Sequence, residues 1–288
     1  MSEITNQPTY KRQRFLLAFL HQLGSGATQT DLQKLVFLNT VVGDSDYYEF
    51  IPYKFGPYSF QLKEDVDVLK RDGFVTRDNA CVEAIGDHPK VHSFQIVRER
   101  GDALIRKTYR DYPYYALNSE ITDRLFSGEE LELFNSNKGT YKKKGEILFT
   151  IGYEGRSIES FINTLIVNDV RLLCDVRKNP LSRKFGFSKH RLVRITQAVG
   201  IKYIHMPDLG IESGKRRSLN TSDDYKYLFD DYRKTLSSKQ KSLDEVFSLL
   251  KENTRIALMC FEQNPEMCHR HIIRDYIIKI SRVDSEDI

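Results

Sequence analysis

Two runs of apolar residues, each followed at once by a polar cluster, constrain this chain more than any other feature. The runs occupy residues 170–173 and 256–259. Continuous apolar runs of this length are typical of parallel strands that are covered on both faces. Polar side chains follow directly, in residues 174–177 and 260–262. Because ligands of open α/β sheets bind at the carboxyl ends of the strands, the two clusters predict a site at one edge of a parallel sheet.

The C-terminal half alternates between strand and helix patterns. We expect four clear strands, at 147–151, 171–175, 202–205 and 255–260, with a fifth strand lost or shortened near Val283. Helices are expected at 157–168, 188–199, 223–236, 243–250 and 268–280. Such alternation implies right-handed crossovers and a parallel sheet with helices on its faces. The predicted fold class is α/β, a three-layer domain with a parallel sheet, preceded by a mostly helical domain.

The N-terminal half begins with helical patterns. Helices are expected at 13–23, after a cap at Thr28 or Thr30, and at 59–72; a strand at 73–76 would pair with one at 91–97. Three helices followed by a β-ribbon are the order of a winged helix-turn-helix. A polar, basic, glycine-containing stretch at 135–145 marks the boundary. We therefore predict a winged-helix-like DNA-binding domain at 1–137 and an α/β catalytic domain at 146–288.

The composition is that of a folded protein with a mildly basic charge. Of 288 residues, 40% are hydrophobic and 29% are charged, with a net charge of +4, which permits nucleic acid binding without demonstrating it. No apolar stretch resembles a signal peptide or a membrane span, and four cysteines in such a chain are expected to stay reduced. We predict a cytoplasmic protein without a membrane partner; the oligomeric state is left open.

The segment 175–184 places four cations beside one carboxylate. Arg177 and Arg183 suit bidentate recognition of phosphate, with Ser182 between them, and Asp175 is a candidate base or nucleophile. The alternative is an internal salt bridge between Asp175 and an arginine that only shapes the loop.

The segment 260–270 supplies a second set of candidates. Glu262 and His269 are candidate catalytic groups, because polar groups at a strand mouth otherwise need buried partners. Arg270 is a candidate phosphate ligand. Cys260 is either a thiolate nucleophile or a small buried apolar residue. Zinc is disfavoured, since the spacing to Cys268 fits no common finger or knuckle.

Three other segments complete the predicted site. Tyr153 and Glu154 follow a strand and precede a helix, where free amides meet anions, and Asp208 lies in a loop after the third strand. Neither a Rossmann glycine pattern nor a Walker lysine is present, so no cofactor is expected. In the N-terminal half, the predicted DNA-binding residues are Tyr53, Lys54, Tyr58 and Arg71. The alternative is that the tyrosines pack a helix and the lysine is solvated.

Several of these motifs, in order along the chain, resemble one known family. They are residues 150–153, 175–177 with Pro180, Ser182 and Arg183, 209–210, and 259–260 with Glu262, Pro265, Cys268, His269 and Arg270. Over residues 147–280 the chain resembles the domain-of-unknown-function family 488, which implies a compact α/β domain of unassigned chemistry. Residues 51–59 resemble the Panacea type of antitoxin-like domain. Residues 175–177 also resemble rhodanese domains, although the loop after Cys260 lacks their cysteine-to-arginine cradle.

The predicted function is that of a DNA-directed enzyme, a glycosylase that hydrolyses the N-glycosidic bond of a modified or foreign base in repair or phage defence. Acids interleaved with arginines would repel the divalent metals of phosphodiester hydrolysis, whereas one carboxylate can stabilise an oxocarbenium-like sugar. The expected partner is therefore DNA, through its phosphate backbone and an extruded nucleotide. Two alternatives stay open: a non-catalytic nucleic-acid-binding regulator that senses a small anion, and a thiol-dependent, rhodanese-like transferase.

Overall fold

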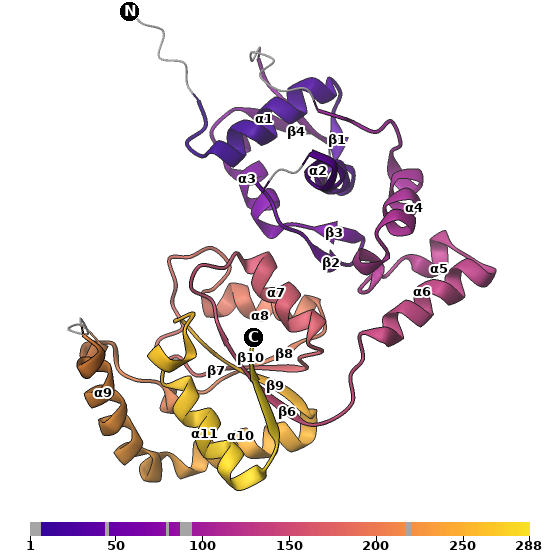
Figure 1. Ribbon diagram of the computed structural model, residues 1–288. Helices are drawn as coiled ribbons and strands as arrows, with labels where there is room; N and C mark the ends of the chain where they lie inside the picture. The colour runs from indigo at the N-terminus through magenta and orange to yellow at the C-terminus, as the bar shows by residue number, and fades with distance from the viewer. Residues whose placement is uncertain (1–6, 44–45, 79–80, 87–93, 217–220) are drawn as a thin grey trace, which may run out of the picture. The chain divides into compact units, whose positions relative to one another are not determined.

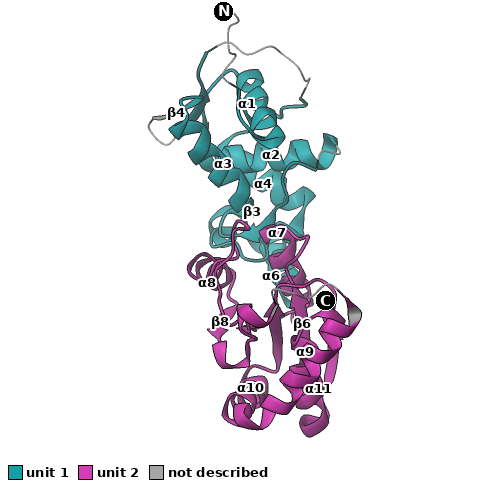
Figure 2. Cartoon of the chain, turned by 90° about the vertical axis from the view of Figure 1, so that its left-hand side faces the viewer, with its two compact units in different colours: residues 1–139 teal, residues 140–288 magenta. Residues whose placement is uncertain are grey.

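The computed structural model describes residues 7–43, 46–78, 81–86, 94–216 and 221–288 (Figure 1). The chain divides into two compact units, Met1–Gly139 and Thr140–Ile288 (Figure 2). Each unit has a hydrophobic core of its own. The predicted boundary stretch at 135–145 is helical up to Thr140, because a helix of unit 1 continues into it.

Unit 1 is largely helical. Its helices are α1 (Lys11–Leu23), α2 (Gln29–Gly43), α3 (Phe60–Arg71), α4 (Gly101–Asp111), α5 (Thr122–Leu125) and α6 (Gly128–Thr140), with a 3-10 turn η1 (Pro113–Ala116). Helix α3 begins where expected, because the hydroxyl of Ser59 accepts a hydrogen bond from the Leu62 amide at 3.1 Å. The first three helices agree with the sequence patterns, whereas α4, α5 and α6 were not predicted.

The strands of unit 1 differ from the expected ribbon. An antiparallel sheet has the order β1 (Ala27–Thr28), β5 (Cys81–Ala84) and β4 (Val75–Asp78). The predicted partner strand at 91–97 is wrong over its described residues, since 94–97 lie outside any strand; 91–93 lie outside the described residues. Instead, β4 pairs antiparallel with the nearer segment β5.

A second antiparallel pair in unit 1 is the hairpin of β2 (Ile51–Tyr53) and β3 (Gly56–Tyr58). Gly56 has a φ of +103°, a conformation that favours glycine. A Cβ atom on Gly56 would lie 2.7 Å from Cε1 of Tyr109 in α4. This glycine therefore allows the hairpin to pack closely against α4.

Unit 2 contains a five-stranded, all-parallel sheet, which confirms the predicted α/β class. Its order is β10 (Asp284–Asp287), β6 (Ile147–Gly152), β9 (Arg255–Cys260), β7 (Leu172–Asp175) and β8 (Lys202–His205). Strand β10 follows Val283, where the sequence predicted a fifth strand that is lost or shortened; the strand is present and has four residues. Gly152 is in register with Cys260, and Asp175 with Met259 and His205. The strands thus end level with one another, and the polar segments after them share one edge.

Helices cover both faces of this sheet. They are α7 (Ile158–Val167), α8 (Lys189–Ala198), α9 (Ser222–Thr235), α10 (Gln240–Asn253) and α11 (Arg270–Ser281); 3-10 turns are η2 (Pro207–Leu209), η3 (Ser213–Arg216), η4 (Leu236–Lys239) and η5 (Pro265–Met267). Helices α7 and α8 lie on one face, and α10 and α11 on the other (Figure 1). Apolar residues of α9, α10 and α11 form one core with the strands. In the described part of the chain, no helix combines the length and apolar character needed to cross a membrane.

Candidate functional site

The loops after β6 and β9 lie against each other at the carboxyl edge of the sheet. A Cβ atom on Gly152 would lie 1.8 Å from the carbonyl oxygen of Glu262, so only glycine fits there. The amides of Tyr153 and Glu154 both donate to the Phe261 carbonyl, at 3.1 and 2.8 Å. The Glu154 carboxylate, which is exposed, accepts from the Gln263 amide at 3.0 Å. Two segments more than 100 residues apart in sequence therefore form one edge.

Asp175, at the end of β7, forms a buried ion pair with Arg177. The two side chains are 0% and 6% exposed, and Nη2 of Arg177 donates to Oδ2 of Asp175 at 2.5 Å. Nε and the amide of Arg177 donate to Oδ1 at 2.8 and 3.1 Å. The Tyr203 hydroxyl, from β8, donates to Oδ2 at 2.6 Å. The internal salt bridge that was the alternative interpretation of this loop is thus present.

The charges of this pair shift the titration of their neighbours. Burial alone would lower the pKa of Arg177, but hydrogen bonds to Asp175 and its charge offset this and raise the pKa. Burial, followed by the charge of Asp175, raises the pKa of Tyr203. The Arg177 guanidinium therefore stays charged beside the carboxyl group of Asp175. A direct role of Asp175 in catalysis, or of Arg177 in phosphate binding, stays a prediction and requires the pair to open.

Tyr153 and Arg270 also face inward. The Tyr153 ring is stacked on Phe187 with centroids 4.3 Å apart, and its hydroxyl accepts from Nη1 of Arg177 at 3.1 Å. Arg270 is 1% exposed. Its guanidinium donates to the Thr150 hydroxyl at 3.0 Å and to the carbonyls of Glu262 and Gln263 at 2.5 and 2.9 Å. In this geometry Arg270 holds the loop after β9, and binding of phosphate by it stays a prediction.

A cluster of sulfur, nitrogen and carboxylate groups lies where β9 ends. Cys260, Cys268 and His269 are buried, and their ligating atoms lie within 4.8 Å of one another. The half-buried Glu262 places Oε2 3.4 Å from Sγ of Cys260. Burial, followed by a hydrogen bond to Cys260, raises the pKa of the Cys268 thiol. Cys260, Cys268 and His269 are the group that could hold a metal ion at this edge, and the Glu262 carboxylate adjoins it through Cys260.

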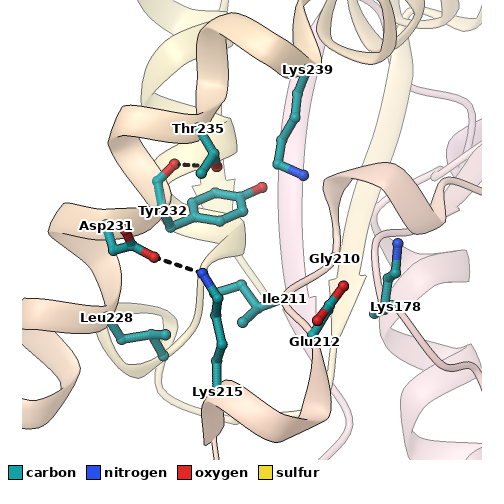
Figure 3. A pocket seen from close by; sticks show the side chains of 10 residues that line it. All are labelled: Lys178, Gly210, Ile211, Glu212, Lys215, Leu228, Asp231, Tyr232, Thr235 and Lys239. Carbon is teal, nitrogen blue, oxygen red and sulfur yellow. Dashed lines mark hydrogen bonds and ion pairs between the residues drawn. The ribbon is translucent and has the colours of Figure 1, made fainter.

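A pocket of about 200 Å³ lies beside the loops after β7 and β8 (Figure 3). Its lining combines three lysines, two acids and five uncharged residues: Lys178, Lys215, Lys239, Glu212, Asp231, Gly210, Ile211, Leu228, Tyr232 and Thr235. The sequence predicted neither this pocket nor Lys239, because the three lysines come from separate segments without a common motif. We call it the lysine pocket.

The lysine pocket has an excess of positive charge. Lys215 pairs with Asp231 at 2.8 Å, which leaves Lys178 and Lys239 opposed by Glu212 among the lining charges. Burial, followed by the charge of Lys178, lowers the pKa of Lys239. The Lys239 ammonium donates to the Asp208 carbonyl. An anion that enters this pocket would therefore relieve repulsion between the lysines.

The remaining predicted site residues of unit 2 lie around these groups. Arg183 and the side chain of Asp208 are exposed, and Ser182 is half-buried. The Ser182 hydroxyl accepts from the Lys184 amide at 3.1 Å, and its own amide donates to the Ser188 hydroxyl at 3.1 Å. Ser182 therefore shapes the loop before α8, whereas Arg183 is accessible to a ligand.

The predicted DNA-binding residues of unit 1 surround the β2–β3 hairpin and the end of α3. The ring centroids of Tyr53 and Tyr58 lie 4.7 Å apart, and the ring centroid of Tyr58 lies 5.0 Å from that of Phe60 in α3. Lys54 pairs with Glu120 at 2.8 Å, and Arg71 with Asp72 at 3.0 Å. The tyrosines thus pack at the start of α3, as the alternative proposed. DNA binding by the four residues stays a prediction.

A second pocket, of about 240 Å³, adjoins the same hairpin and includes a buried lysine. Lys34 of α2 is 1% exposed, and its Cε would lie 3.4 Å from a Cβ atom on Gly56. Burial lowers the pKa of Lys34 to about 7, although the charge of Asp31 opposes this shift. The burial of Lys34 could not be predicted from the sequence, since this lysine lies inside an ordinary apolar helix pattern.

Comparison with known proteins places part of unit 2 in a family context. Neither the curated proteins nor the solved structures contain a match to this chain. The Panacea-like resemblance of residues 51–59 is not shown by any comparison. A family model does match within the range 147–280, which confirms the C-terminal resemblance. Residues 157–277, from the start of α7 to the last turns of α11, match the family described as Domain of unknown function DUF488.

Proposed function

We propose that unit 2 binds a phosphate of a nucleic acid in the lysine pocket and hydrolyses an N-glycosidic bond next to it. The observation that carries this proposal is the convergence of Lys178, Lys215 and Lys239 at the carboxyl edge of the parallel sheet. Ligands of open α/β sheets bind at that edge. The lysine ammonium is a compact point charge and a common phosphate ligand in proteins.

The size of the lysine pocket limits what can enter. Its volume of about 200 Å³ lies below the range of about 300–1,000 Å³ that is typical of sites for drug-sized ligands. We therefore expect a phosphate, with at most its sugar, to occupy the pocket. The rest of a polynucleotide would continue along the exposed loops, where Arg183 is accessible.

The carboxylates near the pocket favour glycosidic cleavage over phosphodiester hydrolysis. Glu212 lines the pocket opposite lysines, and Asp231 is paired with Lys215. Acids separated by cations are poorly placed for the two-metal mechanism of phosphodiester hydrolysis. One carboxylate is enough to stabilise an oxocarbenium-like sugar. In this proposal Glu212, or the half-buried Glu262, fills the role, because Asp175 is held in its ion pair.

The test is an abasic-site assay on the full chain. Plain duplexes and duplexes with modified bases are incubated with the protein and then treated with alkali, which breaks the strand at abasic positions. We expect breaks only in modified DNA. We expect Glu212→Gln to lower the rate about 100-fold or more, the usual size of a general acid–base contribution. A rate unchanged in both Glu212→Gln and Glu262→Gln would exclude this assignment of the carboxylate.

Binding provides an independent measurement. Lys178→Ala and Lys239→Ala should weaken DNA binding and lower the slope of log affinity against log salt by roughly 1 each. Lys226→Ala, on the exposed surface of α9 outside the pocket lining, is the matched control and should reduce both quantities less. Equal effects of all three lysines would mean that the pocket holds no phosphate.

The small volume and positive charge also support a second candidate, a nucleic-acid-binding regulator that senses a small anion. It predicts salt-sensitive DNA binding without alkali-labile sites, and a change in DNA affinity when inorganic phosphate is added. The thiol-transfer alternative is less well supported, because Cys260 is 1% exposed.

A further inference from the structure

The end of β9 and the start of α11 bring three metal-ligating side chains together. Sγ of Cys260 lies 3.9 Å from Nδ1 of His269, and Sγ of Cys268 lies 3.8 Å from the same nitrogen. All three residues are at most 1% exposed. The turn η5 reverses the chain between them, which returns Cys268 to Cys260 despite their separation in sequence.

The tautomer of His269 suits metal binding. Its Nε2 lies 3.1 Å from the Val176 carbonyl, an acceptor, so Nε2 carries the hydrogen and donates it. Nδ1 therefore presents its lone pair toward both sulfur atoms. A histidine that donates its second ring hydrogen to a carbonyl is the usual arrangement around a protein-bound metal.

Glu262 supplies a fourth possible ligand, with Oε2 3.4 Å from Sγ of Cys260. We propose that Cys260, Cys268, His269 and Glu262 bind a zinc ion in tetrahedral coordination. Two thiolates and an imidazole select zinc over the harder magnesium and calcium ions. Zinc–sulfur bonds of about 2.3 Å and zinc–nitrogen bonds of about 2.0 Å place sulfur and nitrogen roughly 3.5 Å apart, so Cys260, Cys268 and His269 close by a few tenths of an ångström. The Glu262 carboxylate, which lies outside this three-residue group, turns further toward the ion.

This ion goes beyond the proposed hydrolysis, because four protein ligands leave no open position and make the site structural. With Glu262 bound to zinc, Glu212 is the carboxylate of the proposed hydrolysis. It joins the end of β9 to the start of α11, and through His269 and Val176 it holds the loop after β7. The Tyr232 ring, which lines the lysine pocket, lies 5.5 Å from the His269 ring. The zinc site thus supports the wall of the lysine pocket from inside.

The test is the zinc content of the full chain. The protein is purified without chelators, and its bound metal is quantified by mass spectrometry. We expect one zinc per chain in the wild type and at least about a tenfold loss of bound zinc in Cys268→Ser and His269→Ala. Cys81→Ser in β5 is the matched control and should retain the full content, since this thiol lies outside the cluster.

A second measurement does not depend on the folding of any variant. Wild-type protein reconstituted with cobalt(II) should show the thiolate-to-cobalt charge-transfer band and the intense visible bands of a tetrahedral site. A folded wild type that takes up neither zinc nor cobalt would refute the proposal, as would a disulfide between Cys260 and Cys268 or full zinc content in Cys268→Ser. Neither measurement involves DNA, so its outcome is independent of the proposed glycosylase activity.

Discussion

Asp175 and Arg177 show how burial determines what a polar residue at a strand end can do. Both lie at the edge where ligands of α/β sheets bind, yet each satisfies the other within the protein. Four hydrogen bonds reach the carboxylate, from Arg177 and Tyr203. We infer that this pair positions the loop after β7, and so the backbone that carries Lys178 to its pocket.

Breaking this pair should destabilise the protein strongly. We expect Arg177→Met to lower the free energy of unfolding by roughly 3–5 kcal/mol, because it leaves the buried Asp175 charge without its partner. Arg183→Met, in the same loop but exposed, should change the free energy by less than about 0.5 kcal/mol. Urea denaturation followed by circular dichroism measures both. Equal free energies of unfolding for Arg177→Met and Arg183→Met would show that the ion pair opens readily.

Lys34 should make stability depend on pH. Its pKa is about 7 when folded and near 10.5 when unfolded. Between these values the unfolded chain binds more protons, so the free energy of unfolding rises with pH, by up to about 1.4 kcal/mol per unit. Below pH 7 the folded protein bears the full penalty of burying the charge.

The corresponding variant is Lys34→Met, which should be more stable than the wild type at pH 6 and flatten the rise between pH 7 and 10. Lys63→Met is the control, because Lys63 lines the same pocket but is partly exposed and paired with Asp67. Thermal unfolding across pH measures the difference. A profile of Lys34→Met parallel to that of the wild type would contradict the lowered pKa.

At the residue scale the sequence identified candidates better than it assigned their roles. The chemistry of Asp175 and its neighbouring arginines is visible in the sequence, and the ion pair was one of two interpretations. Choosing between them requires the burial of both side chains, which depends on strands β8 and β9 far along the chain. Lys239 could not be found, because only tertiary packing brings it to Lys178.

At the scale of elements, local signals predicted most of the boundaries in unit 2. Ser157 caps α7 by accepting a hydrogen bond from the Ser160 amide, and strands β8 and β9 have the predicted limits. The partner of β4 was missed because β5 has one fully buried side chain, Val82, and so lacks the repeated apolar positions that mark a strand.

The contact between the loops after β6 and β9 depends on Gly152. We expect Gly152→Ala to push the Glu262 carbonyl away and to lower stability by about 1–3 kcal/mol, the usual range for overpacking. Gly214→Ala is the control, since a Cβ atom there meets no atom within 4 Å. Differential scanning calorimetry of the two variants compares their melting temperatures, and a neutral Gly152→Ala would mean that the loop yields easily.

At the scale of the whole molecule, each compact unit has its own core. One core combines α1, α2 and α3 of unit 1, and the other combines the parallel sheet with α9, α10 and α11 of unit 2. The sequence predicted the α/β class from the alternation of patterns. It did not predict that α6 continues to Thr140, because the polar stretch there resembles a linker.

Separate cores predict separate folding. Fragments 1–141 and 142–288, expressed individually, should each give a cooperative thermal transition and a helical circular dichroism spectrum. The second fragment retains Lys143, whose amide donates to Asp169. A fragment that shows neither a transition nor amide protection from hydrogen exchange would mean that its core depends on the other unit.

The last strand, β10, also affects how molecules behave in concentrated solution. It forms one border of the parallel sheet, its four residues are exposed, and Asp284, Glu286 and Asp287 are acidic. An open border is a template on which a strand of a neighbouring copy could add, and charged side chains oppose this addition. Replacing these acids by neutral β-branched residues would remove the protection and create a self-assembly hazard.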